Sequence, residues 1–328
     1  MRRAAASRLA AVLCTPLLLL PAACGGADTS NVKVEGAFGK RPNVTIPKAK
    51  PDGKFATRTL IKGKGAQVRK GDLVIADYAG YAWNDSANRL IASSFAGGDI
   101  PAAFPSWQLV PGLEKAMVGA KVGSRLVTVI PPKDGYGAKG APQLQISGQD
   151  SLVYVLDVVA TFPKESGAKG QAQPLSDSRL PQVGAAQPGQ APPVTVPKVA
   201  PPKDLQVRAL IPGTGAPVKS GQVLALQYAG YLWRDGKSFD SSYAAGHPFS
   251  TVIGAKQVMQ GWDQGLIGQK VGSRMLLIVP PRLGYGAKGL KQSGIKGDDT
   301  LVYVVDILGA YGSRRAAVCR PAAAAVRK

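Results

Sequence analysis

The sequence repeats itself once, and this duplication constrains the fold more than any other feature. Residues 77–83 read Asp-Tyr-Ala-Gly-Tyr-Ala-Trp, and residues 227–233 read Gln-Tyr-Ala-Gly-Tyr-Leu-Trp. Three more matches follow in the same order: 121–125 with 270–274, 135–140 with 284–289, and 152–155 with 301–304. Tyr136 and Tyr285 stand 149 residues apart, which is too long for a solenoid repeat and suits a complete domain. Two copies of one domain are therefore predicted.

The chain of 328 residues is long enough for two such domains and their connections. We expect the copies at residues 55–162 and 204–312. Residues 24–54 and 163–203 are rich in Pro and lack apolar periodicity, which predicts a flexible membrane-proximal stalk and a mobile linker. Disorder is the default expectation for the basic tail at residues 313–328.

The N-terminus has the pattern of an export signal over residues 1–23. Two arginines precede an apolar run from Leu9 to Leu20, and small residues then lead to Cys24. This ending resembles the signal of bacterial lipoproteins, in which that cysteine is lipidated. The resemblance implies a lipid anchor at Cys24 and a location on the extracytoplasmic face of the cell membrane. Because Pro21 stands where that family has Leu, cleavage without lipidation is the alternative.

Composition excludes several other classes of protein. The net charge of +21 could indicate a nucleic-acid partner, but the basic residues are spread over linkers, loops and tail, so attraction to an anionic cell envelope is the simpler explanation. The three cysteines, of which Cys14 would leave with the signal, cannot form a disulfide framework or a thiolate metal site. We expect neither a metal nor a cofactor. No run after the signal approaches the ~20 apolar residues of a membrane-spanning helix.

The second copy shows the patterns of a sheet that packs against one helix. Residues 223–232 alternate, with Leu224, Leu226 and Tyr228 on one side, as in a half-buried strand. Residues 275–279 and 301–308 are further β-rich runs. Apolar residues recur at helical spacing between Val258 and Leu266. An α+β fold is predicted for each copy, a curved antiparallel sheet wrapped around one short helix.

Six motifs of the second copy occur in the order found in FKBP-type peptidyl-prolyl cis-trans isomerases. They are Tyr-Ala-Gly at 228–230, Gly-Lys-Ser-Phe-Asp-Ser-Ser at 236–242, Pro-Phe at 248–249, Val-Met-Gln-Gly-Trp at 258–262, Gly-Tyr-Gly at 284–286 and Thr-Leu-Val-Tyr at 300–303. The chain thus resembles a tandem member of this family. The resemblance implies folding assistance for exported proteins, binding of their proline-containing segments, inhibition by macrolides, and a monomer.

The same resemblance assigns the site residues. Trp262 is implied as the floor under the substrate proline, Asp240 as the polar group nearest the isomerising bond, and Tyr285 as a hydroxyl donor to a substrate carbonyl. The implied substrate-binding residues are Tyr228, Phe239, Phe249, Val258, Met259, Ile295 and Tyr303. Met259 replaces the family's usual Ile, and its main-chain amide is implied as a second donor.

The chemistry agrees with these residue types. Rotation about an X-Pro peptide bond breaks no bond, so neither a nucleophile nor a metal is needed. An isolated aromatic would normally be a core residue, and only the ordered set favours a site. The sole histidine, His247, follows Gly246 in a loop, where a solvated surface position is expected.

The first copy departs from the family's pattern. Residues 91–94 read Ile-Ala-Ser-Ser in place of Phe-Asp-Ser-Ser at 239–242, Leu113 replaces Trp262, and Ile100 is aligned with Phe249. Weak or absent isomerase activity with residual peptide binding is predicted there. Two alternatives to an enzyme remain: a non-catalytic peptide-binding module or holdase, and a structural envelope protein without peptide turnover.

Overall fold

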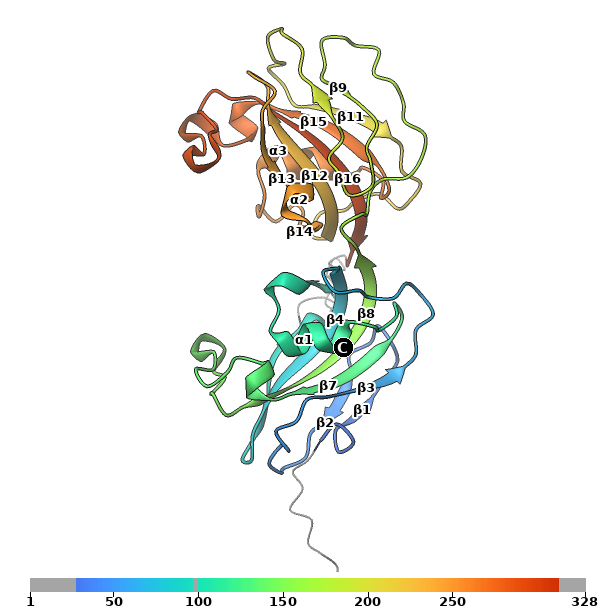
Figure 1. Cartoon of the computed structure of the whole chain (residues 1–328), viewed down its shortest axis with the longest axis vertical. Coiled ribbons are helices and arrows are strands. Elements are labelled where there is room, and N and C mark those ends of the chain that lie inside the picture. Colours follow the sequence, from blue (N-terminus) through green and yellow to red (C-terminus); the bar gives the residue numbers. More distant parts are fainter. Residues whose placement is uncertain (1–27, 97–99, 313–328) are drawn as a thin grey trace, which may run out of the picture.

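Two domains of the same architecture stand end to end in the computed structural model, which describes residues 28–96 and 100–312 (Figure 1). The export signal with Cys24, and the tail with Cys319, lie outside the described residues. The strands of the first domain are β3 (Ala56–Ile61), β4 (Leu73–Trp83), β5 (Asn88–Ser93), β6 (Ala102–Pro105), β7 (Arg125–Ile130) and β8 (Ser151–Phe162). Those of the second are β11 (Gln206–Ile211), β12 (Val223–Leu232), β13 (Ser238–Ser241), β14 (Phe249–Val252), β15 (Arg274–Val279) and β16 (Leu301–Tyr311).

Both sheets are antiparallel and six-stranded, with the same topology. The strand order is β3-β7-β8-β4-β5 in the first and β11-β15-β16-β12-β13 in the second, and the short strands β6 and β14 pair with β4 and β12. The predicted α+β fold is confirmed. Leu224, Leu226 and Tyr228 share the helix side of the sheet, as predicted. The expectation of a half-buried strand was wrong, because Val223, Ala225 and Gln227 on the other side of β12 are buried as well.

One short helix covers the inner face of each sheet: α1 (Pro111–Met117) in the first domain and α3 (Gln260–Leu266) in the second. The second domain adds α2 (Ser242–Ala245), which begins where the Ser241 side chain accepts hydrogen bonds from Tyr243 N and Ala244 N. Val258 and Met259 precede α3 rather than forming its first turn. Among the residues described, no helix combines the length and the apolar character needed to cross a membrane.

The segment before each domain forms a strap across the outer face of the sheet. In the first strap, residues 28–50, β1 (Lys33–Glu35) pairs with β2 (Asn43–Thr45). In the second strap, residues 177–200, β9 (Gln182–Val183) pairs with β10 (Val194–Thr195). Each strap also accepts a hydrogen bond from a buried indole, Trp83 Nε1 to Ala49 O at 3.0 Å and Trp233 Nε1 to Val199 O at 2.9 Å.

Over the described residues 28–54 and 163–203, the structure thus differs from the flexible stalk and mobile linker expected at 24–54 and 163–203. The physical reason is that the central strands carry apolar side chains on both faces: all six residues of β7 and all six of β15 are buried. The outer face therefore needs a cover, which Val32 and Ile46 supply in the first domain and Leu180 supplies in the second. The repeat extends into the straps, since Val-Thr-Ile-Pro-Lys at 44–48 matches Val-Thr-Val-Pro-Lys at 194–198.

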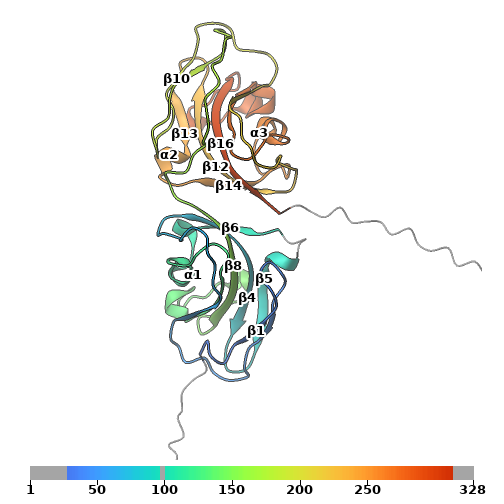
Figure 2. The same cartoon turned by 90° about the vertical axis from the view of Figure 1, so that its right-hand side faces the viewer.

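Aromatic side chains meet where the two domains face each other. Figure 2 shows β6 at the end of one domain opposite β14 at the end of the other. Trp107 of the first domain stacks on His247 of the second, with ring centroids 3.4 Å apart, and Phe162 lies 6.2 Å from Tyr311. His247 is half-buried, and its Nδ1 is buried without a hydrogen-bond partner in the described part of the chain. The expectation of a solvated surface histidine was wrong, because its contact partner belongs to the other domain.

Candidate active site

The predicted site residues of the second domain meet around the indole of Trp262 on α3. Three rings contact it edge to face: Tyr228 at 5.2 Å, Tyr303 at 5.2 Å and Phe249 at 6.2 Å between centroids. Phe239 packs edge to face on Tyr303 at 5.6 Å. We call these five residues the aromatic cluster. Trp262 is only 4% exposed, whereas Tyr228, Phe239 and Phe249 are half-buried, so the cluster runs from the core to the surface.

Two glycines allow the rings and the helix to approach the sheet. A Cβ at Gly230 would lie 2.7 Å from the Phe239 ring and 2.8 Å from the Tyr303 ring. A Cβ at Gly261 would lie 2.5 Å from Val279 on β15. Because such distances are far below van der Waals contact, both positions need glycine for this packing. The Tyr-Ala-Gly motif thus provides the Tyr228 ring and, at Gly230, space for the rings of Phe239 and Tyr303. The Gln-Gly-Trp motif provides the Trp262 indole and, at Gly261, space for Val279.

A polar rim lies at the exposed side of the aromatic cluster. The Tyr228 hydroxyl donates a hydrogen bond of 2.7 Å to Asp240 Oδ2, and the Asp240 side chain is exposed. Burial raises the pKa of Tyr228, with a further contribution from the Asp240 hydrogen bond. Burial also raises the pKa of Tyr285, and the Asp240 charge adds to it. Tyr285 is 37% exposed. Both hydroxyls therefore stay protonated donors at neutral pH.

The remaining predicted residues take different positions. Val258 and Met259 are half-buried and pack against the core at the start of α3. Met259 O accepts hydrogen bonds from Trp262 N and Asp263 N, whereas its own amide has no partner among the described residues. Ile295 is only 3% exposed, and Leu290 N donates to its carbonyl across a narrow loop. Ile295 thus packs within the core rather than on the exposed rim.

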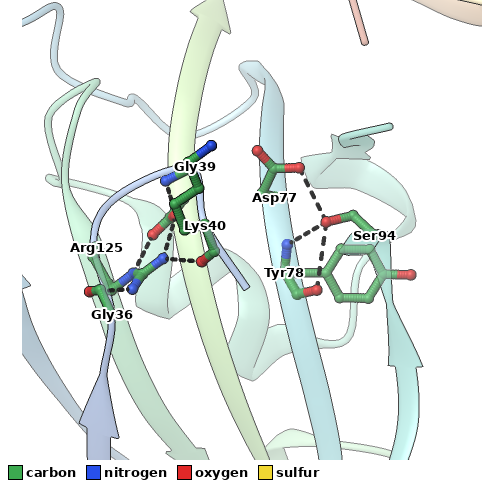
Figure 3. A network of polar contacts seen from close by, with 8 residues as sticks. Gly36, Gly39, Lys40, Asp77, Tyr78, Ser94 and Arg125 are labelled. Atoms are coloured by element: carbon green, nitrogen blue, oxygen red, sulfur yellow. Dashed lines mark hydrogen bonds and ion pairs between the residues drawn. The ribbon is translucent and has the colours of Figure 1, made fainter. Parts of the chain in front are cut away.

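Serine side chains that the sequence did not single out fix the backbone beneath the site. Ser242 Oγ accepts a hydrogen bond from Tyr228 N at 2.8 Å and donates to Gln227 Oε1 at 2.5 Å. The first domain repeats the first contact, with Ser94 Oγ accepting from Tyr78 N at 2.9 Å (Figure 3). The Ser-Ser pair common to both copies was the signal for this role.

The corresponding region of the first domain has a different composition. Leu113 occupies the position of Trp262 on its helix, and Ala92 pairs with Gly80 as Asp240 pairs with Gly230. Tyr78 keeps an edge-to-face contact with Phe104 at 5.4 Å and lies 6.3 Å from Tyr154. The first domain therefore retains an apolar cluster but has neither the indole nor the carboxylate at these positions.

The alignment of Ile100 with Phe249 was wrong. Phe249 pairs with Leu226 on β12, and the equivalent pair on β4 joins Ala102 to Ala76. The aromatic neighbour of Tyr78 is Phe104, two residues further along the same face of β6. Sequence alone could not show this, because strand register decides which side chain reaches Tyr78.

A family model matches both domains. The model for FKBP-type peptidyl-prolyl cis-trans isomerases matches residues 64–159 and again residues 215–308, together more than half of the chain. The chain belongs to this family. Both FKBP domains carry the match, so it does not distinguish the site with Trp262 from the site with Leu113.

Individual relatives match one or both FKBP domains. The "FK506-binding protein" of Streptomyces anulatus is 38% identical over 119 residues, which is 36% of this chain and 96% of that protein. "Peptidyl-prolyl cis-trans isomerase FKBP9" of Mus musculus is 32% identical over 201 residues, which is 61% of this chain and 28% of that protein. The crystal structure of AtFKBP13 shares 32% identity with a TM-score of 0.31, covering 33% of this chain and 94% of that one.

Proposed function

We propose that this FKBP-family chain is a peptidyl-prolyl cis-trans isomerase whose activity resides in its second domain. The observation that carries the proposal is the aromatic cluster around Trp262, with the Tyr228–Asp240 hydrogen bond at its rim. The first domain, built on the same sheet, has Leu113 and Ala92 at the two decisive positions.

The task of the site is to lower a rotational barrier. Rotation about the peptide bond costs ~18–20 kcal/mol because amide resonance is lost, and each tenfold gain in rate needs about 1.4 kcal/mol of differential stabilisation. The planar amide is more charge-separated than the twisted one. A dry aromatic surface therefore disfavours the planar form relative to the twisted form.

Each residue has a part in this proposal. The proline ring rests on the Trp262 indole between Tyr228, Phe249, Val258 and Tyr303, with Phe239 extending the apolar lining. The free Met259 amide and the Tyr285 hydroxyl donate to substrate carbonyls on either side of the bond, which fixes the chain while the bond turns. Asp240 orients the Tyr228 hydroxyl and places negative charge beside the twisting amide.

We also propose that the enzyme acts on exported proteins at the extracytoplasmic face of the membrane, anchored by a lipid on Cys24. The signal pattern at residues 1–23 and the basic charge support this location. Mass spectrometry of the mature N-terminus tests the anchor directly. A diacylated cysteine is expected, and an unmodified N-terminus would contradict the anchor without affecting the catalytic proposal.

A second role is supported for the first domain. Its cluster of Tyr78, Phe104 and Tyr154 is apolar and keeps a half-buried tyrosine. This favours weak binding of peptides without fast turnover, so that the first domain holds a client segment while the second isomerises it.

A protease-coupled proline-peptide assay on the full chain separates the enzyme from a holdase. The double variant Trp262→Leu/Asp240→Ala should lose nearly all turnover, and a macrolide inhibitor of this family should do the same to the unmodified chain. The matched variant Leu113→Ala should keep full turnover. Unchanged activity in the double variant would move the function to the first domain, and no turnover in the unmodified chain would leave a binding protein.

A further inference from the structure

One aromatic stack joins the two domains close to the aromatic cluster. Trp107 lies in the short 3-10 helix η2 (Ser106–Gln108) that follows β6. Its indole is nearly parallel to the imidazole of His247, with ring centroids 3.4 Å apart and an interplanar angle of 17°. Trp107 is 39% exposed and packs in neither core cluster of the first domain. The core of the first domain therefore does not need this large side chain, and its ring contact lies in the other domain.

The stack is the contact that holds the His247 side chain. The imidazole is half-buried, and its Nδ1 is buried without a hydrogen-bond partner in the part of the chain that the structure describes. A buried ring nitrogen without a partner is stabilised by moving to water, where it can be solvated. The apolar face of the Trp107 indole opposes this movement. Removal of the indole is therefore expected to release the imidazole toward water.

A stiff segment connects His247 to the aromatic cluster. His247 is followed by the buried Pro248, whose ring fixes its own φ and restricts the residue before it to extended conformations. Phe249 comes next, and its ring lies 5.5 Å from the Tyr228 ring and 6.2 Å from the Trp262 indole. Because no freely rotating residue separates them, a displacement of His247 is passed on to Phe249.

Gly246 gives this segment its freedom to move. It ends α2 in the left-handed conformation, with φ of 78°, and apart from its chain neighbours no heavy atom lies within 4 Å of the place where a Cβ would stand. The backbone beyond it is held by one long hydrogen bond, from His247 N to Ser242 O at 3.2 Å. Residues 246–249 are thus attached to α2 through a glycine at one end and to β14 at the other, and the stack supports them between these ends.

We propose that Trp107 of the first domain is a positioning residue for the aromatic cluster of the second domain. By stacking on His247 it holds residues 246–249, and it thereby keeps the Phe249 ring in place as a wall for the substrate proline. This inference rests on the isomerase function proposed above. It also gives the tandem arrangement a role, because the first domain, with Leu113 at the place of the indole, contributes to the site of the second.

The kinetic test compares substitutions in the first domain of the full chain. Trp107→Ala removes the stack and should raise KM for a proline peptide about three- to tenfold, because the loosened Phe249 must then be ordered at the moment of binding. kcat should stay within about twofold, since a wall that contacts the proline in the ground state and in the transition state alike provides uniform binding. Trp107→Phe keeps a ring that can stack and should restore most of the affinity. Phe162→Ala, the matched control, removes the other aromatic contact between the domains, 6.2 Å from Tyr311, and should leave KM unchanged.

An NMR measurement separates this test from the test of the isomerase itself. His247 is the only histidine of the chain, so its ring protons are identified without further assignment. The stacked indole should shift these resonances upfield in the unmodified chain and in Phe162→Ala, and the shift should be lost in Trp107→Ala. Titration with a blocked proline peptide at constant pH gives its Kd, which should rise in Trp107→Ala by the same factor as KM.

The outcomes distinguish the two proposals. A rise of Kd in Trp107→Ala, with no turnover in any chain, would refute the isomerase and support the positioning role. Unchanged KM and Kd in Trp107→Ala, an equal rise in Phe162→Ala, or an unmodified chain without the upfield shift would each overturn the role of Trp107. An unmodified chain that does not bind the peptide would overturn both.

Discussion

The two domains of this chain have the same fold and differ in the residues at a few equivalent positions. Both have the same strand order, the same buried Arg–Asp pair and the same serine holding the backbone of a core tyrosine. At the aromatic cluster, however, Leu113 stands for Trp262 and Ala92 for Asp240. The comparison teaches that the fold needs the glycines, the serine and the ion pair, whereas catalysis is proposed to need the indole and the carboxylate.

The straps make the opposite contrast. The first strap is bonded to its arginine through two carbonyls, whereas the second arches over a cavity. The first domain thus has more hydrogen bonds between its strap and its sheet, whereas the second domain has the indole and the carboxylate proposed to act in catalysis. Four experiments can break or sharpen the comparison of the two domains.

The largest effect is expected at the buried ion pairs. Arg125→Met leaves Asp157 buried without its partner and frees the carbonyls of Gly36 and Lys40, and breaking a buried pair in this way costs about 3–5 kcal/mol of unfolding free energy. Arg274→Met should cost about 1–2 kcal/mol less, because no strap bond is lost with it. Urea denaturation, monitored by hydrogen exchange in each domain, measures the loss of unfolding free energy in both variants. Equal losses in the two variants would refute the contrast between the straps.

The next effect is on turnover. Trp262→Leu gives the second domain the residue of the first and should lower kcat/KM for a proline peptide about 10- to 100-fold, or roughly 1.4–2.7 kcal/mol. The substitution removes the indole surface proposed to lie under the proline, and the new leucine keeps the position apolar. Leu113→Trp is the reciprocal control and should not lower turnover. A variant Trp262→Leu with full activity would mean that the indole only fills the core.

A smaller effect is expected from the carboxylate. Asp240→Ala removes the acceptor of the Tyr228 hydroxyl and should lower kcat/KM about three- to tenfold, or ~1 kcal/mol. The control is Asp298→Ala, which removes an exposed carboxylate from another loop. Equal turnover in the two variants would exclude Asp240 from the site.

The smallest effect is on stability at alkaline pH. Burial raises the pKa of Tyr228, Tyr243 and Tyr303 in the second domain and of Tyr78 and Tyr154 in the first, above the ordinary value of 10.0. Above pH 10 the unfolded chain loses these protons and the folded chain keeps them, so stability present below pH 10 falls as the pH rises. Each such tyrosine contributes about 0.4 kcal/mol at pH 10.

Since Phe95 stands where the second domain has Tyr243, the second domain should lose stability faster between pH 9 and pH 11. Chemical denaturation at a series of pH values, with the domains followed separately, measures the two slopes. A steeper loss in the first domain would contradict the assignment of these buried hydroxyls.

The sequence predicted which residues meet around Trp262 because these residues belong to local motifs. Gly230 leaves room for the rings of Phe239 and Tyr303, and Gly261 leaves room for Val279. The glycines in these motifs therefore indicated close packing before the structure was known. The straps were missed because composition suggested disorder, although the unbroken apolar runs of β15 and β16 already indicated strands buried on both faces.

Other features could not be predicted from local patterns. The pairing of Ala102 rather than Ile100 in the place of Phe249 depends on strand register. The stack of Trp107 on His247 joins residues from different domains, and no periodicity within either domain encodes it.

The central claim, that one of the two sites catalyses, is tested most directly by titrating the isomerase activity of the full chain with a tight macrolide inhibitor. We predict that turnover disappears at one equivalent of inhibitor per chain, and that Trp262→Leu loses the tight binding together with the 10- to 100-fold of kcat/KM expected above. Activity that persists until two equivalents are bound, or full activity with unchanged inhibitor binding in Trp262→Leu, would contradict the account.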